Sequence, residues 1–178
     1  MVNPHRCLEC GKFFESPENP RRPRKFCSSA CRQKHYRRNR SQIPAILRNL
    51  NRWSRCVGKR PVMPDGSPAS STDPSTWSPY RDVMSGAGDG FGIMLGDGLA
   101  CWDFDHCLDD DGEMLPDSPA CRLIGRIDYP IFTEVSCSGH GLHVFVKSFA
   151  ASSKRPGVEF YSHSRFIRMT GRRWPYGD

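Results

Sequence analysis

Two aspartates, Asp103 and Asp105, lie two residues apart in a short apolar stretch. On a β-strand such residues project from the same face, while Trp102 and Phe104 point to the other face, toward a core. Two carboxylates this close repel each other unless a cation lies between them, and their oxygens are ligands that Mg²⁺ and Mn²⁺ prefer. The spacing therefore predicts a divalent-metal site on the exposed face of a sheet, although the Asp-x-Asp pattern alone is common.

A glycine-rich segment, SCSGHGLH at residues 136–143, follows further along the chain. Its Ser138, Gly139 and Gly141 predict a turn between two strands, where backbone N–H groups can approach an anion closely. His143 opens the second strand and can donate hydrogen bonds to phosphate oxygens. The alternative for His143 is a structural histidine, and His140 is interpreted as a loop residue.

A third strand candidate, residues 158–161, carries Glu159, and Arg165 follows it closely. If the strands are neighbours, Glu159 faces the same side as the two aspartates. Three carboxylates, a phosphate-facing histidine and nearby cations are the components of phosphoryl or nucleotidyl transfer through two metal ions.

Four cysteines near the N-terminus form two close pairs, Cys7 with Cys10 and Cys27 with Cys31. Paired thiolates at this separation are typical of a four-coordinate zinc site. The segment has too few apolar residues for a core of its own, so a structural Zn²⁺ would supply its folding free energy. His5 and His35 are spare candidate ligands, but we expect four sulfurs.

The net charge of +7, from 26 Lys and Arg against 19 Asp and Glu in 178 residues, is concentrated in one part of the chain. Residues 1–42 hold 11 basic and 3 acidic groups, whereas residues 43–178 hold 15 and 16. We interpret the basic runs at 21–25 and 32–40 as a phosphate-binding surface, the alternative being a solvated charge run. The remainder is itself polarised, with net charges of −10 over residues 82–134 and +6 over 147–173.

The sequence also excludes several classes of protein. It has no run of 18 apolar residues and no apolar N-terminal signal, so we expect a cytoplasmic protein without a membrane span. Nine cysteines without an export signal disfavour a disulfide framework. We interpret the acidic run at 109–113 as a solvated loop rather than a calcium site. Four further cysteines lack ligand spacing and are expected to be buried or half-buried: Cys56, Cys101, Cys107 and Cys121.

The elements expected to position these groups are mostly strands. Helices are predicted over residues 28–40, 43–53 and 118–127, with a long irregular loop over 61–79. Strands are predicted over residues 91–95, 99–105, 131–135, 142–146, 158–161 and 166–170, the first two joined by a Gly-Asp-Gly hairpin turn. This order favours an α+β fold with an antiparallel sheet, divided into a module of residues 1–41 and a domain of residues 42–178.

The three motifs, in this order, resemble those of the archaeo-eukaryotic primase superfamily, most closely the primase-polymerase branch carried by phages and plasmids. The motifs are WDFDH at 102–106, SCSGHGLH at 136–143, and VEFY at 158–161 followed by Arg165. With the segments leading to the first motif, the resemblance covers residues 43–174. Cys137 stands where the family often has proline.

The resemblance implies an RRM-like antiparallel sheet with flanking helices and a role for each motif residue. Asp103, Asp105 and Glu159 would hold two Mg²⁺ or Mn²⁺ ions. His143, Ser138, Gly139 and Gly141 would bind the triphosphate of the incoming nucleotide, and Arg165 and Lys59 would contact nucleotide or template.

The implied function is synthesis of short primers on single-stranded DNA from nucleoside triphosphates, in phage or plasmid replication and in the bacterial host cytoplasm. Cys7, Cys10, Cys27 and Cys31 would form a zinc module that engages template, and a separately encoded replicative helicase would be a partner. Two alternatives stay open: a catalytically inactive DNA-binding accessory protein, and a metal-dependent nuclease with His140 or His143 as base.

Overall fold

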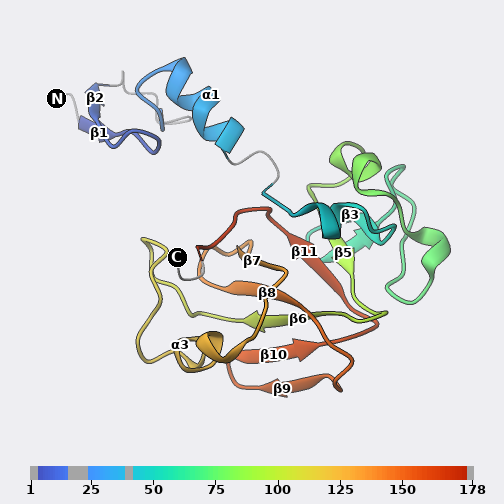
Figure 1. Ribbon diagram of the computed structural model, residues 1–178. Coiled ribbons are helices and arrows are strands. Elements are labelled where there is room, and N and C mark those ends of the chain that lie inside the picture. Colours follow the sequence, from blue (N-terminus) through green and yellow to red (C-terminus); the bar gives the residue numbers. More distant parts are fainter. Residues whose placement is uncertain (1–3, 16–23, 39–41, 176–178) are drawn as a thin grey trace. The chain divides into compact units, whose positions relative to one another are not determined.

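The computed structural model describes residues 4–15, 24–38 and 42–175. The chain divides into two compact units, Met1–Gln42 and Ile43–Asp178, and Figure 1 shows the elements of both. Within the described ranges, no helix is both long and apolar enough to span a membrane.

The N-terminal unit consists of a small hairpin and one helix. Strands β1 (Pro4–Arg6) and β2 (Phe13–Glu15) pair antiparallel, and helix α1 spans Ser29–Arg38. The helix predicted over residues 28–40 is therefore confirmed as far as the described residues reach, since 39–41 lie outside them. The hairpin was not predicted, because three-residue strands give too short a pattern.

The larger unit contains two antiparallel sheets, with strand orders β7-β8-β6-β10-β9 and β11-β5-β3-β4. The predicted α+β class with antiparallel pairing is confirmed. The strands are β3 (Trp53–Val57), β4 (Arg60–Val62), β5 (Gly90–Met94), β6 (Leu99–Phe104), β7 (Phe132–Val135), β8 (Leu142–Lys147), β9 (Ser153–Arg155), β10 (Val158–Tyr161) and β11 (Phe166–Met169). The six predicted strands correspond to β5, β6, β7, β8, β10 and β11, whereas β3, β4 and β9 were missed.

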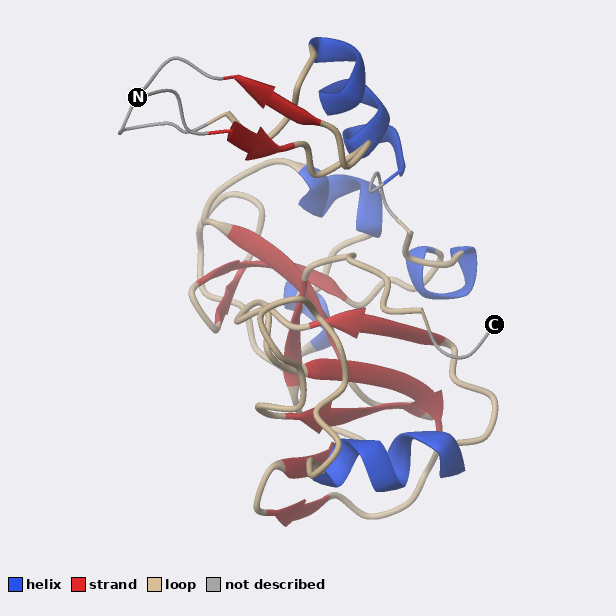
Figure 2. Cartoon of the chain, turned by 90° about the vertical axis from the view of Figure 1, so that its left-hand side faces the viewer, coloured by secondary structure: helices blue, strands red, loops and turns tan. Residues whose placement is uncertain are grey.

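The five-stranded sheet has apolar residues on both faces. On one face Cys101 and Phe145 share a core with Trp53 and Ile93 of the four-stranded sheet. On the other face Phe104 and its neighbours pack against α3 (Pro119–Leu123) and the 3₁₀ turn η3 (Ile124–Arg126), a helical segment visible in Figure 2. The helix predicted over 118–127 is thus confirmed, with Ser118 capping its first turn through the N–H of Cys121.

The helix predicted over residues 43–53 is wrong in its second half. Helix α2 spans only Ala45–Arg48, and Trp53 begins β3. The apolar residues follow a helical spacing because two different elements contribute to one core. Leu47 of α2 and Trp53 of β3 are both buried. The indole N–H of Trp53 donates to the carbonyl of Leu47 at 3.1 Å. Ile46, an apolar residue at the same helical spacing, is 61% exposed.

The predicted turn at residues 96–98 exists, but it does not form an extended hairpin. Gly96 and Leu99 exchange two backbone hydrogen bonds of 3.0 Å, with Asp97 and Gly98 at positive φ. Strands β5 and β6 then enter different sheets, because β5 pairs with β3 and β11 while β6 pairs with β8 and β10.

Smaller predictions have mixed outcomes. The segment 61–79 is largely irregular, but it contains the end of β4 and a 3₁₀ turn, η1 (Pro74–Thr76). A second such turn, η2 (Tyr80–Met84), follows. Cys56, Cys101 and Cys107 are buried as expected, whereas Cys121 is exposed, because it lies on the outer side of the short helix α3.

Candidate functional site

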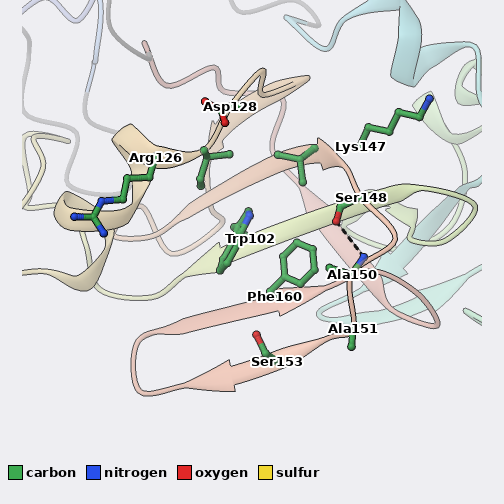
Figure 3. A pocket seen from close by; sticks show the side chains of 11 residues that line it. Trp102, Arg126, Asp128, Lys147, Ser148, Ala150, Ala151, Ser153 and Phe160 are labelled. Atoms are coloured by element: carbon green, nitrogen blue, oxygen red, sulfur yellow. Dashed lines mark hydrogen bonds between the residues drawn. The ribbon is translucent and has the colours of Figure 1, made fainter.

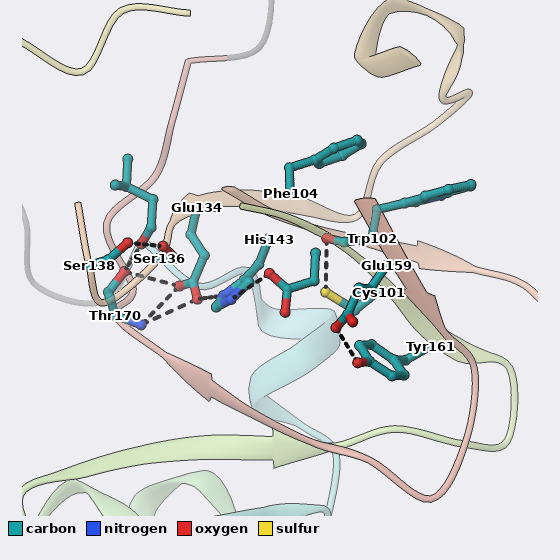
Figure 4. Close-up of polar contacts among 12 residues, drawn as sticks. Cys101, Trp102, Phe104, Glu134, Ser136, Ser138, His143, Glu159, Tyr161 and Thr170 are labelled. Carbon is teal, nitrogen blue, oxygen red and sulfur yellow. Dashed lines mark hydrogen bonds and ion pairs between the residues drawn. The ribbon is translucent and has the colours of Figure 1, made fainter. Parts of the chain in front are cut away.

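Four polar side chains from neighbouring strands form one row across the five-stranded sheet. In the strand register Glu134 of β7 lies opposite His143 of β8, His143 lies opposite Asp103 of β6, and Asp103 lies opposite Glu159 of β10. Residues directly opposite each other in antiparallel strands have Cβ atoms about 4.5–5.5 Å apart. We call Glu134, His143, Asp103 and Glu159 the polar row; most of it is labelled in Figure 4.

The polar row shares its face of the sheet with the apolar core. Cys101, two residues before Asp103, is completely buried, and the Asp103 side chain is only 19% exposed. The expectation of an open, solvated face is therefore wrong, because the second sheet packs against part of that face. The predicted anchor on the opposite face is present, with Phe104 buried and Trp102 half-buried.

Asp103 lies in an environment that disfavours its charged form. Burial raises the pKa of its carboxyl group, and the charges of Asp105 and Glu159 raise it further, while His143 and Lys59 act in the opposite direction. Asp105 itself is exposed just beyond the end of β6. A bound cation would relieve this repulsion, so the donor chemistry of the two aspartates fits Mg²⁺ or Mn²⁺.

Glu159 belongs to the polar row, but its carboxylate has other partners. Its carboxylate accepts hydrogen bonds from the Tyr161 hydroxyl and forms an ion pair of 3.0 Å with Lys154. These hydrogen bonds and the Lys154 and Arg165 charges lower the pKa of Glu159 despite its partial burial. Asp103 and Glu159 thus share one face of the sheet, but with Asp105 they do not gather as closely as the ligands of one metal ion.

His143 is held between two carboxylates. Its Nδ1 lies 3.0 Å from Oε1 of Glu134, and its Nε2 lies 3.6 Å from Oδ1 of Asp103. Burial alone would lower the pKa of His143, but the hydrogen bond and charge of Glu134, with the charges of Asp103 and Asp105, raise it overall. The geometry therefore favours an imidazolium, which can donate from Nε2 to an anion.

Glu134 is the residue of this site that the sequence interpretation missed. It is fully buried, and its carboxylate accepts hydrogen bonds from the N–H of Gly171 at 2.7 Å, from the N–H of Thr170 at 3.1 Å, and from the Thr170 hydroxyl. A fully buried glutamate occurs almost exclusively with such partners. The available signal was an acidic residue inside a predicted strand, on the same face as His143 across a hairpin.

The turn predicted between β7 and β8 is present, and it comes close to β6. Gly139 has φ +90°, and a Cβ at Gly141 would lie 2.6 Å from the carbonyl oxygen of Phe104. The hydroxyls of Ser136 and Ser138 are 3.1 Å apart. The guanidinium of Arg172 donates to the carbonyl of Ser136 at 2.9 Å, so a positive charge lies beside this turn.

Lys59 and Arg165 are both exposed, and both act electrostatically on the polar row. Lys59 lies in the β3–β4 turn, and its charge lowers the pKa of Asp103. That turn is fixed by Arg168, which donates to the carbonyl of Gly58 at 2.7 Å. The Arg165 guanidinium lies 4.4 Å from the centroid of the Tyr161 ring.

The four N-terminal cysteines form a second candidate site, with sulfur atoms that all lie within 4.8 Å of one another. The Cys10–Cys27 and Cys27–Cys31 sulfur distances are 3.6 and 3.5 Å. Tetrahedral zinc with Zn–S bonds of about 2.3 Å requires about 3.8 Å between sulfurs, so the set could hold a metal such as zinc. Within the described part of the chain, no other group of three or more His, Cys, Asp or Glu side chains is gathered this closely.

The cysteine site favours thiolate at Cys7. Burial opposes ionisation there, but backbone N–H groups of Cys27, Cys10 and Glu9 point at the sulfur, and the net effect lowers the pKa of Cys7 to about 6. Hydrogen bonding with Cys31 and Cys10 raises the pKa of Cys27 to about 12. A thiolate at Cys7 with three further sulfurs close by is the arrangement that a shared cation stabilises. His5 instead lies against the ring of Phe14, with centroids 5.9 Å apart.

Only part of the predicted basic surface can be located. Arg24, Lys25, Arg32 and Lys34 are exposed. Residues 21–23 of the first run and 39–40 of the second lie outside the described residues, as do the side chains of His35, Arg37 and Arg38.

Comparison with known proteins finds a similarity to a DNA primase-polymerase of Nitratiruptor phage NrS-1. The two sequences are 30% identical over 152 residues, a match that covers 73% of this chain. The chain spans 21% of the length of the phage protein. No family model matches the chain. The similarity supports the relationship to primase-polymerases that the motif order indicated.

Proposed function

We propose that this chain is a primase-polymerase that joins nucleotides on a single-stranded DNA template. The observation that carries the proposal is the polar row, in which cross-strand register places His143 beside Asp103 and next to a glycine-rich turn. The similarity to the phage primase-polymerase is in accord with it. The core would be an RRM-like sheet, formed by the five strands that carry this row.

Asp103 and Asp105 would hold the divalent ions, with Glu159 joining after exchange of its partners. Bound Mg²⁺ or Mn²⁺ would supply activation of the attacking 3′-hydroxyl and charge stabilisation of the pyrophosphate leaving group. The two aspartates orient their oxygens from the end of β6, and burial of Asp103 limits access of water to that side. For Glu159 to contribute, its carboxylate must release Lys154, which then becomes free to face a phosphate.

His143 and the turn that precedes it would bind the triphosphate. Glu134 accepts the Nδ1 proton of His143 and so directs Nε2 toward the carboxylates and any phosphate held there. Ser138 and Gly141 would present hydroxyl and backbone donors to the same anion, and Gly139, whose N–H donates to the carbonyl of Ser136 at 3.1 Å, would hold the turn in shape and join them after release of that bond. Lys59, Arg165 and Arg172 add positive charge around it.

The N-terminal unit would be a structural zinc module that engages template through its basic residues. In this arrangement residues 1–41 bind DNA and residues 42–178 carry catalysis. The protein would act in phage or plasmid replication in the host cytoplasm, beside a separately encoded helicase.

Primer synthesis on an oligonucleotide template, with nucleoside triphosphates and Mn²⁺, tests the proposal. We expect extension products from the wild-type chain and from Asp117→Ala, an exposed control, but none from Asp103→Ala. Synthesis by Asp103→Ala at the wild-type rate would refute the site. A shortened template would instead indicate a nuclease, and retarded DNA without synthesis would indicate an inactive accessory protein.

A further inference from the structure

The five-stranded sheet carries a pocket of about 380 Å³ on the face opposite the polar row (Figure 3). Trp102 and Phe160 line it, with ring centroids 4.6 Å apart. The segment 126–128 and the loop 147–153 supply the other walls. Trp102 precedes Asp103 on β6 and points to the other side, so the pocket is separate from the candidate catalytic site.

Two exposed aromatic residues flank this pocket. Tyr129, which is 94% exposed, follows the lining residue Asp128, and Phe149, which is 79% exposed, lies between the lining residues Ser148 and Ala150. They are the two most exposed large hydrophobic side chains in the described part of the chain. Tyr129 also has a backbone φ of +49°, a conformation that is uncommon for a non-glycine residue. Both rings are therefore exposed beside the pocket, where they can contact a ligand that enters it.

The two residues lie at the same end of the sheet. Tyr129 lies three residues before β7 and Phe149 two residues after β8, and these strands are antiparallel, with Phe132 opposite Phe145. Ser148 in turn donates to the carbonyl of Gly98 at 2.9 Å, which ties this loop to the start of β6. The strand ends therefore place Tyr129 and Phe149 at one end of the sheet, each adjacent in sequence to residues that line the Trp102 pocket.

The charge around the pocket favours a polyanion. Arg126 and Lys147 line it against one acid, Asp128. Aromatic rings on which bases stack, interleaved with cations that follow a phosphate backbone, are the means by which proteins bind single-stranded nucleic acid without sequence preference.

We propose that Tyr129, Phe149 and the Trp102 pocket form a second contact for single-stranded DNA, with bases stacked on the aromatic rings. The inference rests on the proposed function, because it takes the template of that reaction as the ligand. DNA bound here would contact the side of the sheet away from the reacting groups, and so would add affinity without entering the chemistry.

Binding of a fluorescein-labelled oligothymidylate to the full chain tests this inference by anisotropy. The double variant Tyr129→Ala/Phe149→Ala should raise Kd about 5- to 100-fold, the range for loss of base stacking. Met84→Ala, which removes a side chain that is 49% exposed elsewhere in the same unit, is the matched control and should leave Kd unchanged. An oligonucleotide carrying 5-iododeoxyuridine should also photocross-link to peptides containing residues 126–131 or 147–153.

Wild-type affinity in the double variant, with no cross-link to these peptides, would overturn the inference and leave a protein partner as the occupant to seek. Primer extension measured on the same preparations separates the two proposals. If the wild-type chain extends primers while the double variant binds DNA normally, only this inference fails. If the wild-type chain makes no primers but the double variant loses DNA affinity, the proposed function fails and the contact stands.

Discussion

Replacing Glu134 by glutamine tests how the site controls its histidine. The substitution keeps the shape of the side chain but removes the buried charge that lies 3.0 Å from Nδ1 of His143. A hydrogen bond between charged groups contributes about 1.5–3 kcal/mol, so loss of its ionic part should weaken triphosphate binding by about 10- to 100-fold. We expect the KM for nucleoside triphosphate to rise by this factor in primer extension, with a smaller change in kcat.

The pH dependence gives a second measurement of the same substitution. The hydrogen bond and charge of Glu134 raise the pKa of His143 against the effect of burial, so nucleotide binding that needs the imidazolium is present below that pKa and is lost as pH rises through it. Without the carboxylate the pKa falls, and the alkaline loss of kcat/KM should begin at lower pH in Glu134→Gln than in the wild type.

Two controls show whether an effect of Glu134→Gln comes from loss of the fold or from a change of net charge alone. Circular dichroism should show that Glu134→Gln retains its fold, since its amide oxygen can still accept from the N–H of Gly171. Glu113→Gln changes the same charge in an exposed loop and should leave KM and the pH profile unaltered. A folded Glu134→Gln protein with wild-type KM and an unshifted alkaline limb would refute the role assigned to Glu134.

Three other substitutions have expected outcomes that follow from the structure. Cys27→Ser should reduce bound zinc, measured by mass spectrometry of the metal, from about one ion per chain to none, whereas exposed Cys121→Ser should retain it. Gly141→Ala should lower the free energy of unfolding by about 1–3 kcal/mol in urea titrations, because its Cβ would clash with a backbone carbonyl, while Gly125→Ala, which meets nothing within 4 Å, should be near neutral. Lys59→Ala should raise the KM for nucleotide about tenfold or less without a change in melting temperature, because Lys59 is exposed and contributes charge alone. An unchanged KM would show that Lys59 does not contribute to nucleotide binding.

Local sequence pattern was sufficient for much of the fold. Alternating or continuous apolar runs identified six strands, including the three that bear Asp103, His143 and Glu159, because period-two patterning is a property of a strand by itself. The spacing of Cys7, Cys10, Cys27 and Cys31 likewise predicted a cluster, since close pairs on turns bring thiols together with little help from the remainder of the chain.

The same local reasoning failed where two elements share one core. Apolar residues at helical spacing over 43–53 suggested one helix, but Leu47 and Trp53 reach the same core from a helix and from a strand. A turn between residues 96 and 98 suggested one hairpin, but β5 before it pairs within the four-stranded sheet and β6 after it pairs within the five-stranded sheet. In both cases the deciding contacts are between residues far apart in sequence.

The sequence by itself determined the residue types of the candidate site, Asp103, His143 and Glu159, and the strands that carry them. Only the tertiary structure decided their neighbours, because side-chain contacts across a sheet depend on strand order and register, which no local pattern encodes. Register placed buried Glu134 behind His143 and directed Glu159 toward Lys154 and Tyr161. It also gave β6 two faces with different partners, carboxylates on one side and the aromatic pocket around Trp102 on the other.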